Sequence, residues 1–109
     1  MVLLTSPNNP TGTPLPMEDI ERILAACETA EVVGAGEGVH PILVIDEAYV
    51  EFRKPGTRAV SLIKDHPNLA VSRTMSKAFA FAGARVGTWP RPRASSMRAY
   101  LVCRTTCPP

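Results

Sequence analysis

Short apolar runs alternate with turn-forming stretches along most of the chain. Val2–Leu4 is an apolar run consistent with a buried strand, and it ends at residues 6–12, where prolines, asparagines and a glycine are typical of a turn. Ile42–Ile45 contains only aliphatic residues in succession, a pattern typical of a strand that is covered on both faces. Leu69–Ser72 predicts another such strand.

One amphipathic helix is predicted between the first two strands, from about Met17 to Ala30. Its apolar residues fall at i, i+3, i+4 and i+7, which places them in one stripe: Ile20, Ile23, Leu24 and Cys27. Pro16 suits the first turn, where its missing N–H is no loss. The order strand, helix, strand, connection, strand is typical of an open α/β sheet with mostly parallel strands.

Composition and charge exclude several classes. The chain has 109 residues, enough for one small domain, and a formal net charge of +2 that gives no strong attraction to nucleic acid. No apolar run approaches the roughly 18 to 20 residues of a membrane span. The 3 cysteines, in a sequence that starts without a signal peptide, indicate reduced thiols. We therefore expect a cytoplasmic protein with neither nucleic-acid nor membrane partners.

Polar residues that are suited to binding or catalysis follow each predicted strand. Asn9 lies in the turn after the first strand, Asp46 and Tyr49 follow the second, and Lys77 follows the third. In open α/β sheets ligands bind at this carboxyl edge. Taken singly, each residue has a plainer interpretation. Asp46 with Glu47 could be a helix N-cap with a solvated neighbour, and a lysine alone is usually a surface charge.

Together and in this order, these segments resemble the class I/II aminotransferases, pyridoxal-phosphate enzymes of fold type I. The resemblance is carried by Ser6–Gly12 (SPNNPTG), Asp46–Tyr49 (DEAY), Ser76–Lys77 and Gly83–Gly87 (GARVG). Within the family, Asp46–Phe52 and Thr74–Phe79 are most similar to the histidinol-phosphate aminotransferases. The resemblance implies an α/β fold: the central, incomplete part of a large domain with a mostly parallel sheet and flanking helices.

The resemblance also implies a site for pyridoxal 5'-phosphate. Lys77 matches the lysine that holds the cofactor as a Schiff base and moves a proton at the α-carbon of the substrate. Asp46 matches the aspartate that keeps the pyridine nitrogen protonated. Asn9 and Tyr49 match the two hydrogen-bond donors to the phenolic oxygen.

Three further residues match groups that hold the cofactor phosphate. They are Thr74, Ser76 and Arg85, which supply two hydroxyls and a guanidinium fork. Glu47 has no counterpart role, and no metal site is expected. Cys103 and Cys107 lack the second pair or histidine that a zinc site needs.

The implied reaction moves an amino group between an amino acid and a 2-oxo acid. In this branch histidinol phosphate and 2-oxoglutarate give imidazole acetol phosphate and glutamate, in histidine biosynthesis, and members are homodimers. Two alternatives stay open: a related class I/II aminotransferase with another amino-acid substrate, or a non-functional truncated product. We expect negligible turnover from these residues alone, because members several hundred residues long supply a substrate-binding arginine from a segment that this sequence lacks.

The likeness ends near Thr88. We therefore divide the chain into residues 1–87, a partial large domain that binds pyridoxal phosphate, and residues 88–109, an irregular tail rich in proline and arginine. With GC-rich codons, one base added before Thr88 turns Thr-Trp-Pro-Arg into Tyr-Leu-Ala-Ala, which resembles the family. A one-base frameshift at about Thr88 is thus our hypothesis for the tail. Its four arginines among prolines are weak grounds for a nucleic-acid-binding function.

Overall fold

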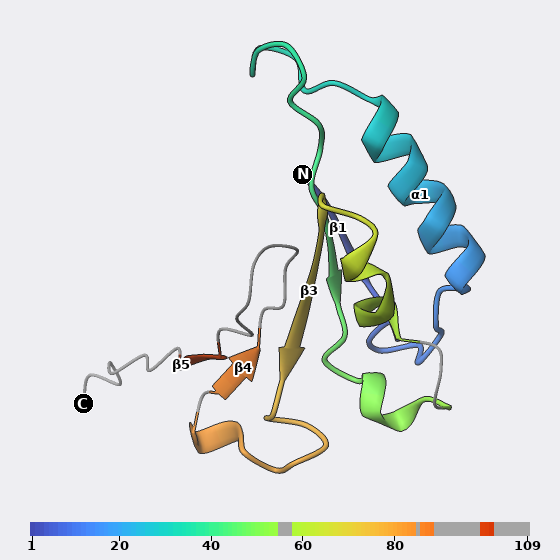
Figure 1. Cartoon of the computed structure of the whole chain (residues 1–109). Coiled ribbons are helices and arrows are strands. Elements are labelled where there is room, and N and C mark those ends of the chain that lie inside the picture. Colours follow the sequence, from blue (N-terminus) through green and yellow to red (C-terminus); the bar gives the residue numbers. More distant parts are fainter. Residues whose placement is uncertain (55–57, 85, 89–98, 102–109) are drawn as a thin grey trace.

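A sheet with the strand order β1-β2-β3-β4-β5 is the framework of the structure (Figure 1). This computed structural model describes residues 1–54, 58–84, 86–88 and 99–101. The strands are β1 (Val2–Thr5), β2 (Leu43–Asp46), β3 (Leu69–Thr74), β4 (Val86–Thr88) and β5 (Ala99–Leu101). One α-helix, α1 (Met17–Thr29), and three short 3₁₀ helices, η1 (Val50–Phe52), η2 (Ala59–Lys64) and η3 (Ala82–Ala84), complete the described elements.

The first three strands are parallel, as the sequence predicts. Leu4 pairs with Ile45, which in turn pairs with Val71. The strand predicted from Ile42 begins one residue later, and Ile42 is 52% exposed. The strand predicted to end at Ser72 continues to Thr74, so it reaches two residues further toward the proposed site.

The prediction of a buried first strand is wrong at Leu3, which is 61% exposed. Within the described residues β1 pairs with β2 alone, at the edge of the sheet. Side chains alternate between the two faces of a strand. Val2 and Leu4 therefore pack against the core, whereas Leu3 points to the opposite face.

The core lies between α1 and one face of the parallel strands (Figure 1). The predicted helical stripe is confirmed: Ile20 and Leu24 are fully buried, Cys27 is 6% exposed and Ile23 is partly buried. The strands contribute Leu43, Ile45, Leu69 and Val71, and η2 contributes Ala59. Burying such side chains stabilises a fold by roughly 1.5 to 3 kcal/mol each. The helix therefore anchors the parallel strands from which the site turns emerge.

The last two strands are antiparallel to their neighbours. Thr88 of β4 pairs with Arg73 of β3, and Gly87 pairs with Tyr100 of β5. Ala99–Leu101 thus forms a strand inside the segment that we expected to be irregular; the rest of that tail after Thr88 lies outside the described residues. None of the helices in the described part of the chain is long and apolar enough to span a membrane.

Candidate active site

Three turns meet at the carboxyl edge of the parallel strands. Figure 1 shows β1 and β3 pointing to the same end of the molecule, where η1 and the turn after β3 lie. Thr5, Asp46 and Ser72 occupy the same level of the sheet, because Thr5 pairs with Asp46 and Asp46 with Ser72. Since parallel strands end together, residues distant in sequence are brought close at this edge.

The proline-rich turn after β1 is stabilised by hydrogen bonds between its own backbone and side-chain groups. The Asn8 N–H donates to the Thr13 carbonyl at 2.9 Å, and the Gly12 N–H donates to the Asn8 carbonyl at 2.8 Å. Gly12 has a φ of 71°, a conformation that glycine adopts without strain. Asn8 also bonds the Thr11 hydroxyl, at 2.9 Å. Asn9 stands exposed at the tip of this ordered turn.

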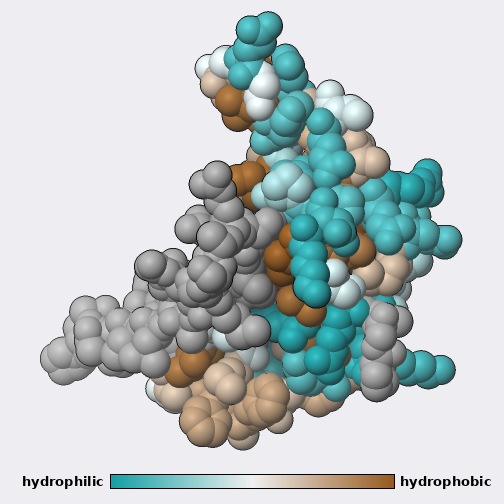
Figure 2. All heavy atoms as spheres, viewed as in Figure 1, coloured by the Kyte–Doolittle hydropathy of each residue, from teal (hydrophilic) through white to brown (hydrophobic). Residues whose placement is uncertain are grey.

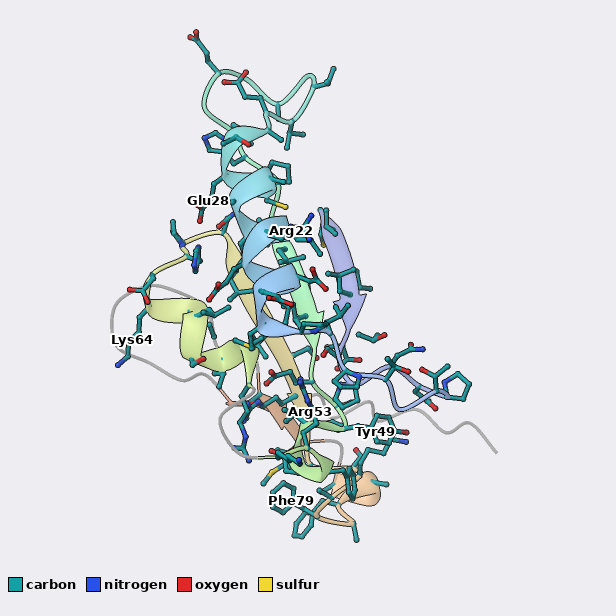
Figure 3. All side chains as sticks on the ribbon, turned by 90° about the vertical axis from the view of Figure 1, so that its right-hand side faces the viewer. Arg22, Glu28, Tyr49, Arg53, Lys64 and Phe79 are labelled. Atoms are coloured by element: carbon teal, nitrogen blue, oxygen red, sulfur yellow. The ribbon has the colours of Figure 1, made fainter. Side chains whose placement is uncertain are left out.

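A hollow of about 250 Å³ separates this turn from the turn after β2. Its lining residues are Pro7, Asn8, Asn9, Pro10, Gly12, Tyr49, Phe52 and Arg53. Figure 3 shows Tyr49 and Arg53 close to one another at the foot of the strands. Asn9 and Tyr49, which the resemblance pairs at one cofactor oxygen, therefore line the same space.

Asp46 is the last residue of β2 and is half-buried. Its Oδ1 accepts the Ala48 N–H at 3.1 Å, so the carboxylate is tied to the backbone that follows it. Tyr49 comes next, and its ring lies 6.3 Å from that of Phe52, centroid to centroid, tilted by 38°. The turn after β2 thus fixes both a carboxylate and a phenol.

The last residue of β3 and the turn after it supply two hydroxyls and the lysine. Thr74 Oγ1 donates to Ser76 Oγ at 2.9 Å and accepts the Ser76 N–H at 3.1 Å. Lys77 is exposed, and its Nζ lies 5.4 Å from the centroid of the Tyr49 ring. An ammonium within about 6 Å of an aromatic centroid is attracted to the ring face. This contact joins the turn after β3 to the turn after β2.

The predicted site residues therefore come together in part. Tyr49 contacts Lys77 and shares the hollow with Asn9, and Thr74 bonds Ser76. In the described part of the chain, neither Asp46 nor Asn9 forms a hydrogen bond with Lys77. Arg85 lies outside the described residues.

Sequence reasoning missed Glu47 and Arg73. Glu47 is 1% exposed, although it could have been taken for a solvated neighbour of Asp46. Arg73 donates to Glu47 Oε2 from Nε at 2.9 Å and from Nη2 at 2.6 Å. The alternation of strand positions could have indicated their burial. Residues two apart in a strand lie on the same face, and Glu47 follows the buried Ile45 by two residues, as Arg73 follows the buried Val71.

Apolar side chains surround the lysine turn. Figure 2 shows tan and brown spheres at the lower margin of the molecule, where Figure 1 places this turn. Met75, Phe79 and Phe81 are 37%, 51% and 56% exposed. Figure 3 shows Phe79 at the foot of the structure, away from α1.

The architecture defines an α/β protein with its candidate site at the carboxyl edge of parallel strands. Comparison with known proteins narrows that class. The family model "Aminotransferase class I and II" matches residues 1–89, and the chain belongs to that family.

Individual relatives agree with this assignment. The histidinol-phosphate aminotransferase of Bifidobacterium longum (strain NCC 2705) is 98% identical over 88 residues, which are 80% of this chain and 23% of that protein. The crystal structure of the histidinol-phosphate aminotransferase from Clostridium acetobutylicum matches with a TM-score of 0.65 and 32% identity, over 79% of this chain and 23% of that one.

A third similar protein was solved with a cofactor. It is the histidinol-phosphate aminotransferase from Sinorhizobium meliloti in complex with pyridoxal-5'-phosphate, with a TM-score of 0.58 and 34% identity over 83% of this chain and 22% of that one. The family resemblance and the fold that it implies are confirmed by these comparisons. The chain spans about 23% of the length of the first of these relatives.

Proposed function

We propose that this chain provides the pyridoxal-phosphate-binding part of an aminotransferase that acts on histidinol phosphate. The contact of Lys77 with the Tyr49 ring, 5.4 Å from Nζ to the centroid, is the observation that carries the proposal. It brings the amine that would bind the cofactor to the phenol that would hold the cofactor's oxygen. The name of the Bifidobacterium relative, 98% identical over 88 residues, supports the choice of substrate.

The side chains at this edge fit the chemical groups of pyridoxal phosphate. An aldehyde calls for an amine, which Lys77 offers, and a pyridine nitrogen calls for a carboxylate, which Asp46 offers in a fixed orientation. Thr74 and Ser76 present two hydroxyls 2.9 Å apart, which suit a phosphate. The amine, the carboxylate and the two hydroxyls are therefore chemically complementary to the groups of the cofactor.

Each residue then has a distinct task. When bound, the cofactor draws electrons from the α-carbon of the amino acid. Lys77 binds the cofactor aldehyde and afterwards carries a proton to and from that carbon. Asp46 holds a proton on the pyridine nitrogen, while Asn9 and Tyr49 donate hydrogen bonds to the phenolic oxygen.

The phosphate is the anchor of the cofactor in this proposal. Thr74 and Ser76 donate their hydroxyl protons to its oxygens, and Arg85 provides the matching positive charge. Fixing the phosphate at one end and the nitrogen at the other leaves the reactive carbon in one position. Such positioning supplies much of the rate of an enzyme.

The substrates in this proposal are histidinol phosphate and 2-oxoglutarate, and the products are imidazole acetol phosphate and glutamate. A homodimer in the cytoplasm is the expected state of the full-length enzyme. A partial large domain at residues 1–87 is consistent with the family match over residues 1–89. Because substrate binding needs segments outside this chain, we expect cofactor capture without measurable turnover.

Borohydride trapping tests cofactor capture. The chain is incubated with pyridoxal phosphate, reduced, digested and analysed by mass spectrometry, and the adduct is expected at Lys77. The Lys77→Ala variant should lose it, whereas Lys64→Ala, an exposed lysine of η2, should keep it. Equal labelling of Lys64 and Lys77, or no adduct at all, would contradict a formed site.

Substrate choice needs a complete enzyme. The corresponding 88-residue segment of the Bifidobacterium longum relative can be replaced by that of this chain, since the two are 98% identical there. The chimera is expected to transaminate histidinol phosphate with 2-oxoglutarate. A clear preference for another amino acid would favour the related-aminotransferase alternative instead.

A further inference from the structure

We propose that Glu47 and Arg73 are positioning residues of the cofactor site. Their ion pair, in which the Glu47 carboxylate is buried, holds the end of β2, which carries Asp46, against the end of β3, which leads into the turn of Lys77. This inference rests on the proposed function and adds to it two residues that touch neither cofactor nor substrate.

Both carboxylate oxygens of Glu47 accept hydrogen bonds. Arg73 donates to Oε2 from both Nε and Nη2, at 2.9 and 2.6 Å, and the Ala59 N–H donates to Oε1. The Glu47 side chain is 1% exposed and that of Arg73 is 20% exposed. Three elements, β2, β3 and η2, therefore converge on one carboxylate.

Strand alternation places this pair on the opposite face of the sheet from Asp46 and Thr74 of the proposed site. Leu43 and Ile45 of β2 face the core under α1, and Glu47 continues their face; Arg73 continues that of Leu69 and Val71. Asp46 and Thr74 have the opposite parity, so they belong to the other face. Each positioning residue is thus the immediate sequence neighbour of a residue proposed to bind the cofactor.

Backbone hydrogen bonding connects the ion pair to the proposed site. The Glu47 N–H donates to the Ser72 carbonyl at 2.8 Å, which extends the pairing of β2 with β3 by one residue. Any slip between the two strand ends would separate Glu47 from Arg73. A buried carboxylate without its partner is costly, so such a slip is strongly disfavoured.

Glu51 offers a matched comparison. Its Oε1 lies 3.9 Å from Arg73 Nη1, and its side chain is 21% exposed. It belongs to η1, and its distance of 3.9 Å from the arginine is too long for a hydrogen bond. We expect this pair to contribute less than the pair with Glu47, because it lacks the two hydrogen bonds that Arg73 donates to Glu47.

The test shortens each side chain of the pair without removing its charge. Glu47→Asp and Arg73→Lys keep the signs of the charges but lose the reach that both bonds require, and Glu51→Asp is the control. Each full chain is titrated with pyridoxal phosphate, and the dissociation constant is corrected for the folded fraction measured by far-ultraviolet circular dichroism. Visible circular dichroism per bound cofactor reports the orientation of the cofactor.

We expect Glu47→Asp and Arg73→Lys to weaken binding by about tenfold, the lower end of the effect that outer partners have at metal sites. Their visible dichroism should also change, while Glu51→Asp should match the unaltered chain. A purely structural pair would lower the folded fraction yet leave the corrected constant and the dichroism unchanged, and that result overturns the inference. Failure of the unaltered chain to bind cofactor overturns the proposed function itself, and this inference with it.

Discussion

Gly87 packs against the backbone of Arg73 so closely that a Cβ built on it would lie 2.7 Å from the Arg73 carbonyl oxygen. Contacts this short to backbone force a shift. Glycine at this position therefore lets β4 pair with β3 immediately beside the ion pair of Arg73 with Glu47.

The Gly87→Ala variant should consequently be destabilised by about 1 to 3 kcal/mol, the usual cost of overpacking. Chemical denaturation followed by circular dichroism measures it. Gly83→Ala is the matched control, since a Cβ there meets nothing within 4 Å, and it should stay within about 0.5 kcal/mol of the unaltered chain. Equal effects of the two substitutions would show that the close approach to Arg73 has no energetic consequence.

Tyr49 combines two contributions that substitution can separate. Tyr49→Phe keeps the ring beside Lys77 but removes the hydroxyl proposed to bond the cofactor, so cofactor affinity should fall about threefold to tenfold, the size of one hydrogen bond. Tyr49→Leu also removes the ring that contacts Lys77 and lines the hollow with Asn9, so it should weaken binding further. Fluorescence titration with pyridoxal phosphate measures both.

A result in which Tyr49→Phe binds as the unaltered chain does would argue against the hydroxyl as a cofactor ligand. If instead Tyr49→Phe and Tyr49→Leu were equally impaired, the contact of the ring with Lys77 would contribute nothing to binding. The two variants therefore report on different parts of one side chain.

The parts of the fold that the sequence predicts are those with a local periodic pattern. Helix α1 follows from the spacing of Ile20, Leu24 and Cys27, and β2 follows from an unbroken aliphatic run. The exposure of Leu3 does not follow from its own strand, because it depends on which neighbours flank β1 in the sheet.

The residues of the candidate site also fall into those that the sequence predicts and those that it does not. Asn9, Asp46, Tyr49 and Lys77 stand at strand ends, where the order of elements and the family resemblance both direct attention. Glu47 and Arg73 are 26 residues apart in sequence and carry charges that normally lie at the surface. Alternation along each strand indicates that each side chain faces the core, but their pairing becomes visible only when strand register places them side by side.

Ser6 supports the proline-rich turn from within. It is 1% exposed, and its hydroxyl accepts the Leu15 N–H at 3.0 Å and the Arg53 Nη1 at 3.3 Å. Ser6→Ala leaves a part-buried N–H unpaired, so the free energy of unfolding should fall by about 1 to 3 kcal/mol. Urea denaturation measures the loss.

Ser61→Ala serves as the control for Ser6. The Ser61 hydroxyl donates to the Arg58 carbonyl at 2.8 Å, but the residue is exposed and water can replace the bond. We expect a change below about 0.5 kcal/mol. A Ser6→Ala variant as stable as Ser61→Ala would mean that the turn is held by its prolines and the bonds of Asn8 instead.

The reading frame after Gly87 is open to direct measurement. The family match ends at residue 89, close to the point where Thr88-Trp89-Pro90-Arg91 replaces the expected Tyr-Leu-Ala-Ala. We predict that resequencing the coding DNA across Gly87 and Thr88 reveals one additional base, followed by a long frame that encodes the remainder of an aminotransferase. The tail residues would then carry no selected function. A frame that stands as written, with no aminotransferase sequence in any downstream frame, contradicts the prediction and makes cofactor capture at Lys77 the activity to measure in this chain.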